Sequence, residues 1–357
     1  PFRPFTAARS PVSIRVLLLL AAAARAGVFT VTALRAWTVE AEGGATLLEL
    51  RENVVVSDGE VTVVSDSATL REEEELAEFS GDVRVTHDSV SATGRYLSYS
   101  RPQGLLLLTG NAVLNDGESV LRADRITWFR FAGKATALGG VVMTGDWLGE
   151  VTGEYALYDR ERGSFFVTSE PVLRRAEEGD SMTITAQKLE FFLDGERAEA
   201  QGDALLRMPS RELIVSAEYL LYFGEEDRLE MVGSPQVEAP EGALEGDWME
   251  MRLRDGDPES LRIEGNARGN LGRGDSVTVD FNSQKAFFGF IPGMELDSLH
   301  LSGTATLTAV SSGRVRAEAN TITAEDLVLR FRGGDLDRMT ARGTVRGTYS
   351  WSGESSD

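Results

Sequence analysis

Apolar and polar residues alternate along most of the chain, a pattern typical of β-strands with one buried face. The stretch FSGDVRVTHDSVSATGRYLSYS, residues 79–100, shows this alternation and one slip in its phase. Val90 and Ala92 keep even spacing, whereas Leu97 and Tyr99 follow Gly94 by three and five residues. Because neighbouring side chains on a strand point to opposite faces, the slip predicts that the strand bends at Gly94.

The same slip recurs along the chain as a repeat. A small residue followed by apolar residues at +3 and +5 occurs nine times, at intervals of 29 to 41 residues. The small residues are Ser65, Gly94, Ala123, Gly153, Ala186, Ala217, Gly246, Ser283 and Ala324. The apolar residues that follow them include Leu97, Tyr99, Ile126, Trp128, Tyr158, Leu189, Phe191, Leu220, Tyr222, Met249 and Met251. A period near 30 residues predicts a repeat architecture.

Each copy carries a second landmark, which is usually glycine. It follows the small residue by 16 residues in the first six copies and by 19 or 20 in the last three. These landmarks are Gly81, Gly110, Gly139, Ser169, Gly202, Gly233, Gly265, Gly303 and Gly343. Apolar residues tend to follow them at +2 and +4, as at Val83, Val85, Leu114, Val141, Met143 and Leu206. This spacing predicts a further strand with one buried face.

Small residues near the middle of each strand predict a fold line across the sheet. An extra residue at a position such as Ala123 would form a β-bulge, which bends the strand and redirects later side chains. Stacked over the repeats, these bends predict a creased sheet with an apolar groove inside it. The crease is expected at Gly81, Gly94, Gly110, Ala123, Gly139, Gly153, Ala186, Gly202, Ala217 and Gly233.

Short polar connections favour antiparallel pairing. RPQG, RERG, DGER and EEDR each separate two apolar stretches, and such turns are typical of hairpins. A parallel solenoid with about 30 residues per coil is the alternative. Residues 47–64 are rich in β-branched residues and lack proline, so they are expected to form an exposed edge that pairs with another chain.

The N-terminal segment is typical of an export signal. Arg3, Arg9 and Arg15 precede the apolar run VLLLLAAAA, which ARA follows at residues 24–26. Residues 1–26 are therefore expected to be a signal peptide, and an uncleaved inner-membrane anchor to Leu34 is the alternative. Residues 27–254 carry the regular repeats, and 255–357 are expected to continue them in divergent form. Export without cysteine is compatible with a bacterial periplasm.

Charge and composition exclude several function classes. The 357 residues include 57 acidic and 36 basic ones, a net charge of −21 that repels nucleic acid. The same charge disfavours general attraction of an anionic lipid head group. There is no cysteine and there are only two histidines, and no catalytic or metal-binding motif occurs. A non-enzymatic protein without cofactor or metal is expected.

Several stretches resemble the OstA-like repeat family, which includes proteins of the LptA and LptC type and the N-terminal domain of LptD. They are FSGDVRVTHDSVSATGRYLSY, LTGNAVLNDGESVLRADRITWF and AQGDALLRMPSRELIVSAEYLLYF. The resemblance implies an all-β repeat-built β-jellyroll, or β-taco, whose interior holds the acyl chains of lipopolysaccharide. It also implies end-to-end assembly with other OstA-like components in the periplasm.

The resemblance therefore assigns the apolar repeat residues, with Val83 and Tyr99 among them, to a lipid-binding groove. It predicts a bridge protein that shields lipid A acyl chains between the inner and outer membranes, with self-association as a further expectation. There are two alternative functions. The first is that of a structural β-repeat protein that assembles at the envelope through its edge strands. The second is that of a carrier of another lipid.

Overall fold

The computed structural model describes the chain from residue 30 to residue 349, apart from short gaps. The gaps are residues 41–45, 58–60, 88–89, 116, 118, 146–148, 178–179, 193–196, 255–256, 274–276, 292–294, 313–316 and 334. The described residues form two compact units, the first containing residues 30–175 and 187–192 and the second containing 176–186 and 197–349. The expected signal segment, residues 1–26, lies outside the described residues.

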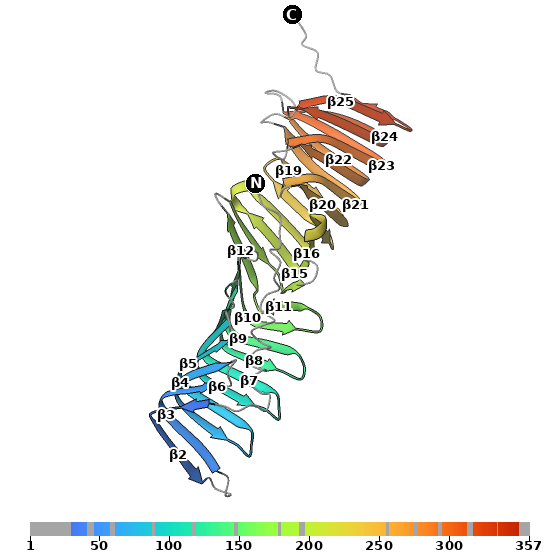
Figure 1. Ribbon diagram of the computed structural model, residues 1–357. Coiled ribbons are helices and arrows are strands. Elements are labelled where there is room, and N and C mark those ends of the chain that lie inside the picture. Colours follow the sequence, from blue (N-terminus) through green and yellow to red (C-terminus); the bar gives the residue numbers. More distant parts are fainter. Residues whose placement is uncertain are drawn as a thin grey trace, which may run out of the picture. The chain divides into compact units, whose positions relative to one another are not determined.

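The first unit consists of successive antiparallel strands joined by short turns (Figure 1). Its strands are β1 (Thr30–Thr32), β2 (Arg35–Glu40), β3 (Thr46–Ser57), β4 (Thr62–Arg71), β5 (Leu76–His87), β6 (Val90–Ser100), β7 (Leu105–Asn115), β8 (Ser119–Phe129), β9 (Lys134–Gly145), β10 (Gly149–Asp159), β11 (Ser164–Thr168), β12 (Val172–Glu177) and β14 (Lys188–Phe192).

The second unit continues the same architecture with longer strands toward its end. It contains β13 (Asp180–Thr185), β15 (Arg197–Met208), the 3-10 turn η2 (Pro209–Arg211), β16 (Leu213–Phe223), the 3-10 turn η3 (Gly224–Glu226), β17 (Arg228–Val232), β18 (Gln236–Ala239), β19 (Gly242–Glu245), β20 (Trp248–Arg254), β21 (Asp257–Arg273), β22 (Val277–Ile291), β23 (Glu295–Ser312), β24 (Ala317–Arg332), β25 (Asp335–Arg342) and β26 (Arg346–Thr348). The expected change at residue 255 from regular to divergent repeats falls inside this unit and stays a prediction.

The structure confirms the all-β, antiparallel fold. The ladders between consecutive long strands, such as β5–β6, β7–β8 and β22–β23, are all antiparallel, so the parallel solenoid is excluded. The described residues contain no α-helix. Accordingly, no helix in the described part of the chain is long and apolar enough to cross a membrane.

A shift in pairing register crosses the sheet where the fold line was expected. The bulges lie in the strands that carry the glycine landmarks, here called the glycine strands. Between β7 and β8, Thr109 pairs with Arg125 and Ala112 pairs with Ala123. Gly110 and Asn111 therefore lie opposite Asp124 alone. The extra residue predicted at Ala123 was misplaced, because a bulge is a property of two paired strands and the partner register is not visible in one strand.

The backbone conformation at Gly110 and Asn111 explains why the bulge requires glycine followed by asparagine or a similar residue. Gly110 has φ +82 and Asn111 has φ +57, two successive left-handed conformations that favour glycine and asparagine. A Cβ on Gly110 would lie 2.7 Å from the Cβ of Arg95, on β6. The same close approach of a neighbouring strand's polar side chain recurs at other bulges, from Asp66, Asp124, Glu218, Asp247, Gln284 and Glu325.

The N-terminal edge of the sheet differs from the sequence-based expectation. Both β1 and β2 pair with β3, β1 beyond the crease and β2 before it. Val54 and Val56 of β3 are buried. Residues 47–64 are therefore not the exposed edge, and β1 and β2 take that place. Their segment was missed because residues 30–34 adjoin the apolar N-terminal run and precede the first regular repeat.

Candidate functional site: the apolar interior

The crease divides the sheet of the first unit into two arms. Arm one includes residues 96–109 and 125–138, and arm two includes residues 83–93 and 112–122. Buried residues of both arms belong to one apolar cluster. The two arms therefore face a shared interior.

In arm one, the interior side chains form continuous rows across the strands. The row nearer the crease runs through directly paired residues, namely Phe79, Leu97, Leu108, Ile126, Ala137, Ala156, Val167 and Leu189. The row nearer the turns consists of Leu70, Ala77, Tyr99, Leu106, Trp128, Ala135, Tyr158, Phe165 and Phe191. Direct cross-strand pairing brings such side chains into contact.

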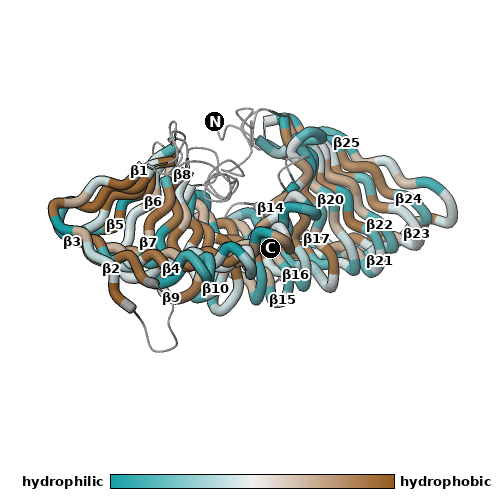
Figure 2. The backbone as a smooth tube through the Cα atoms, turned by 60° about the horizontal axis from the view of Figure 1, so that its bottom comes forward, coloured by the Kyte–Doolittle hydropathy of each residue, from teal (hydrophilic) through white to brown (hydrophobic). Residues whose placement is uncertain are grey.

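Arm two carries a matching row. It consists of Val85, Ala92, Leu114, Leu121, Met143, Val151 and Leu173. Its members are short or flexible, and most of them are buried. Figure 2 shows the apolar positions recurring at matching places on successive strands.

The second unit repeats this arrangement. One of its rows contains Ala200, Leu220, Met231, Met249, Ile263, Ala286, Leu301 and Leu327. A second contains Tyr222, Leu229, Met251, Leu261, Phe288, Leu299 and Leu329. Beyond the crease, Leu206, Val215, Val237 and Leu244 begin the row of the other arm.

Most of the residues expected to line a groove are buried by one another. The buried ones are Val83, Val85, Leu97, Leu114, Ile126, Trp128, Val141, Met143, Leu189, Phe191, Leu206, Leu220, Tyr222 and Met249. Tyr99, Tyr158 and Met251 are partly buried. The small crease residues face inward as well: a Cβ on Gly94 would lie 2.8 Å from Cδ1 of Leu108. The interior in this structure is closely packed.

Part of the interior in the strands that carry the glycine landmarks was not predicted from the sequence. Apolar residues also lie four and two positions before most of these landmarks, and many of them are buried. Examples are Phe79, Leu106, Leu108, Ala135, Ala137, Met231, Ile263 and Leu301. The alternation in the sequence could have indicated these positions, because inward-facing residues keep even spacing through the bulge in the glycine strand. Leu108 and Ala112, for example, are four residues apart and both face the interior.

Three aromatic residues in the outer row of arm one have buried polar atoms. The Tyr158 hydroxyl and Nε1 of Trp128 make no hydrogen bond to any described residue, whereas the Tyr99 hydroxyl lies beside the Arg130 guanidinium. Burial raises the pKa of the Tyr99 hydroxyl, and the nearby Arg130 guanidinium opposes that rise. Burial likewise raises the pKa of Tyr158, and Arg160 opposes it.

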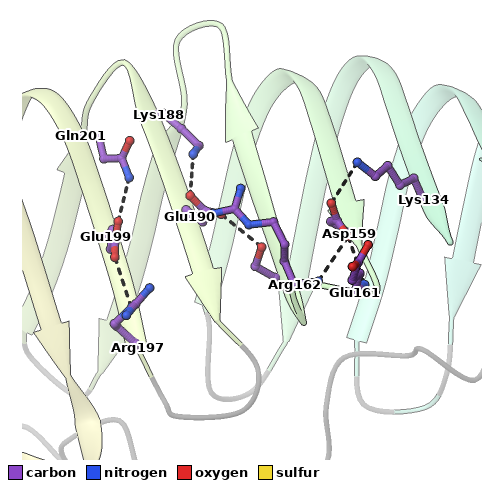
Figure 3. A network of polar contacts seen from close by, with 10 residues as sticks. Lys134, Asp159, Glu161, Arg162, Lys188, Glu190, Arg197, Glu199 and Gln201 are labelled. Carbon is purple, nitrogen blue, oxygen red and sulfur yellow. Dashed lines mark hydrogen bonds and ion pairs between the residues drawn. The ribbon is translucent and has the colours of Figure 1, made fainter. Parts of the chain in front are cut away.

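Charged side chains near β10, β11 and β14 form hydrogen-bonded pairs (Figure 3). Glu190 is only 1% exposed and accepts a hydrogen bond from Ser164 Oγ at 3.1 Å. Its carboxylate also lies 2.5 Å from Nζ of Lys188 and 3.6 Å from Nη2 of Arg162. A buried carboxylate needs such partners. Glu190 alternates with the interior residues Leu189 and Phe191 along β14, so this network belongs to the opposite face of the sheet.

No other chemistry competes with the apolar interior among the described residues. They contain no group of three or more His, Asp or Glu side chains placed to hold a metal ion. The expected absence of catalysis, cofactor and metal stays a prediction.

Comparisons with known proteins found one family model that matches part of the first unit. Residues 31–169 match the family model described as OstA-like protein. The search of curated proteins gave no match. Among solved structures, the chain is similar to LptH of Pseudomonas aeruginosa, described as the LptA homologous periplasmic component of a lipopolysaccharide transport device. The two are 15% identical, the similarity covers 49% of this chain and 82% of that one, and the TM-score is 0.16. Residues 31–169, most of the first unit, are therefore similar to OstA-like proteins.

Proposed function

We propose that the protein binds the acyl chains of lipopolysaccharide in its apolar interior and shields them during transit through the periplasm. The observation that carries this proposal is the set of unbroken apolar rows on both arms, which converge on one interior. The match to OstA-like proteins and the similarity to LptH, a periplasmic component of lipopolysaccharide transport, support it.

Acyl chains suit this interior because both are apolar and make no directional contacts. Burial of apolar surface contributes about 25 cal/mol per Å² whatever the orientation of the chain. An acyl chain that inserts between the two arms replaces contacts between apolar side chains with contacts between those side chains and the lipid. A lipid could therefore move along a row without breaking hydrogen bonds. Directional movement would then need an energy source outside this chain.

Photo-crosslinking in cells tests this function. A photoreactive residue at Leu114, Trp128 or Leu206, all of which are buried, should form adducts with lipopolysaccharide. Arg84 and Arg122 are exposed residues next to Val85 and Leu121, and they serve as matched outward positions. Adducts from interior positions alone are the expected result. Equal adducts from Arg84 and Arg122 would contradict the proposal.

A second function is favoured by the close packing of the interior. A creased sheet whose core is already filled could serve as a structural protein of the envelope that assembles through β1, β2 or β26. In that case the interior positions would give no lipid adduct, while a crosslinker on β1 or β2 would join the chain to a protein. A phospholipid adduct from the interior would instead identify a carrier of another lipid.

A further inference from the structure

The turn edge of arm one in the first unit carries a row of arginines beside the buried polar atoms of three aromatic residues. Arg101, Arg130 and Arg160 each follow an aromatic residue of the outer row by two positions. The preceding residues are Tyr99, Trp128 and Tyr158. This combination occurs in three consecutive repeats, whereas the preceding copy has Leu70 followed by Glu72.

Backbone hydrogen bonds hold the three turns in register. The amide of Arg101 donates to the carbonyl of Glu75 at 3.1 Å, that of Arg130 to Gly104 at 2.7 Å and that of Arg160 to Gly133 at 3.0 Å. Each aromatic residue lies two strands from the next, about 10 Å across the sheet. The arginines therefore recur at a regular spacing along the same edge as the aromatic side chains.

Two of these arginines have no compensating carboxylate. Arg101 lies 3.5 Å from Glu75. Neither Arg130 nor Arg160 forms an ion pair with any described residue. Acidic groups nearby are already engaged or solvated: Asp159 pairs with Lys134 at 3.1 Å, and Glu161 lies in the exposed turn after Arg160. Arg130 and Arg160 therefore place two cations without an ion pair to a described residue beside the aromatic row.

The aromatic row has polar atoms that lack a hydrogen-bond partner. Trp128 is only 3% exposed, and its Nε1 is a donor without an acceptor among the described residues. The Tyr158 hydroxyl, at the corresponding position of the next repeat, has no partner among them either. Buried polar atoms without partners cost free energy, so this recurrence needs an explanation. A polar group entering beside the arginines would supply the missing hydrogen bonds.

We propose that this edge binds the phosphate group of an anionic amphiphile, with Arg130 and Arg160 as its cationic partners. The polar atoms of Tyr99, Trp128 and Tyr158 then contact the atoms that join the head group to the acyl chains. The proposal rests on the proposed function, since the acyl chains lie in the interior behind the aromatic row. Guanidinium groups are well suited to phosphate oxygens. Phosphate of this kind occurs in lipopolysaccharide and in phospholipids.

Paired ligands with the same acyl chain test the proposal. Dodecyl phosphate and dodecyl maltoside, both below their micelle concentrations, are titrated into the purified protein by calorimetry. The double variant Arg130→Gln/Arg160→Gln should bind the phosphate about tenfold more weakly, as expected from the loss of two partly exposed charge pairs, and bind the maltoside unchanged. Replacement of both by lysine should restore part of the affinity for phosphate.

The matched control removes the same charge from the outer face of β8. Arg122→Gln/Arg125→Gln replaces two exposed arginines that have no ion pair with a described residue. It should leave both affinities unchanged, and an equal loss of phosphate binding would overturn the proposal. Equal binding of phosphate and maltoside by the unmodified protein would also overturn it while leaving the proposed function intact. If neither ligand binds, the proposed function and this inference fail together.

The aromatic residues provide a separate readout. Tyr158→Phe keeps the ring and removes an unpartnered hydroxyl, so it should weaken phosphate binding without lowering the melting temperature of the free protein. A lower melting temperature with unchanged binding would assign the hydroxyl a purely structural role. Vesicle pulldown with phosphorylated and dephosphorylated lipid A, and with phosphatidylglycerol and phosphatidylcholine, then identifies the source of the phosphate.

Discussion

At the scale of single residues, the crease depends on backbone conformation and on close approach between strands. Gly110 adopts a positive φ and lies beneath the side chain of Arg95. Gly117, in the turn after β7, also has a positive φ, of +91, but no atom lies within 4 Å of the position of its Cβ. Comparing substitutions at these two glycines therefore distinguishes the cost of backbone strain from the cost of steric contact with a neighbouring strand.

Alanine at these two glycines should therefore destabilise the protein unequally. Gly117→Ala should lower the free energy of unfolding by about 1–2 kcal/mol, the cost of a left-handed non-glycine residue. Gly110→Ala should cost about 1–3 kcal/mol more, since its Cβ would also overlap Arg95. Urea denaturation followed by circular dichroism measures both. A loss at Gly117 equal to or greater than that at Gly110 would contradict this account of the crease.

At the scale of strands and turns, much of the fold could be predicted from the sequence. The period near 30 residues and the alternation gave the strands, and the short polar turns predicted antiparallel pairing. The bulge was assigned to the wrong strand because Ala123 shows the phase slip while Gly110 and Asn111 carry the extra residue. The interior positions before the glycine landmarks and the arginines two residues after Tyr99, Trp128 and Tyr158 could also have been predicted from this spacing.

The turn between β10 and β11 should make stability depend on pH through Asp159. Burial acts to raise the pKa of this carboxyl, but the hydrogen bond from Lys134 and the backbone N–H groups of Arg162 and Glu161 prevail and lower it. A lowered folded-state pKa contributes stability that is present above the unfolded pKa of about 3.9. That stability is lost as the pH falls through the folded pKa.

Asp159→Asn should accordingly lower the free energy of unfolding by about 1–2 kcal/mol at pH 7. The difference in free energy of unfolding between the variant and the unmodified protein should disappear as the pH falls below about 3.9. Asp297→Asn is the control, because Asp297 pairs with Arg330 at the same 3.1 Å but is 43% exposed. It should change stability by less than about 0.5 kcal/mol. A gap for Asp159→Asn that persists unchanged at pH 2.5 would refute the assignment.

At the scale of the whole chain, two units carry one structural plan. The OstA-like match ends at residue 169, close to the end of the first unit's main segment at residue 175. The second unit has the same creased strands and apolar rows outside that match. Each unit by itself therefore offers an apolar interior, whereas the arginine edge belongs to the first unit. Crosslinking at Leu206 therefore tests the second unit separately.

The central claim is that the interior carries the acyl chains of lipopolysaccharide, and the bound lipid can be measured directly. The protein is isolated from the cell envelope without detergent, extracted with organic solvent and analysed by mass spectrometry for the fatty acids of lipid A. We expect these fatty acids in near-stoichiometric amount, and their loss from a Trp128→Glu variant that remains folded by circular dichroism. A folded, unmodified protein that yields no lipid A fatty acids would contradict the account.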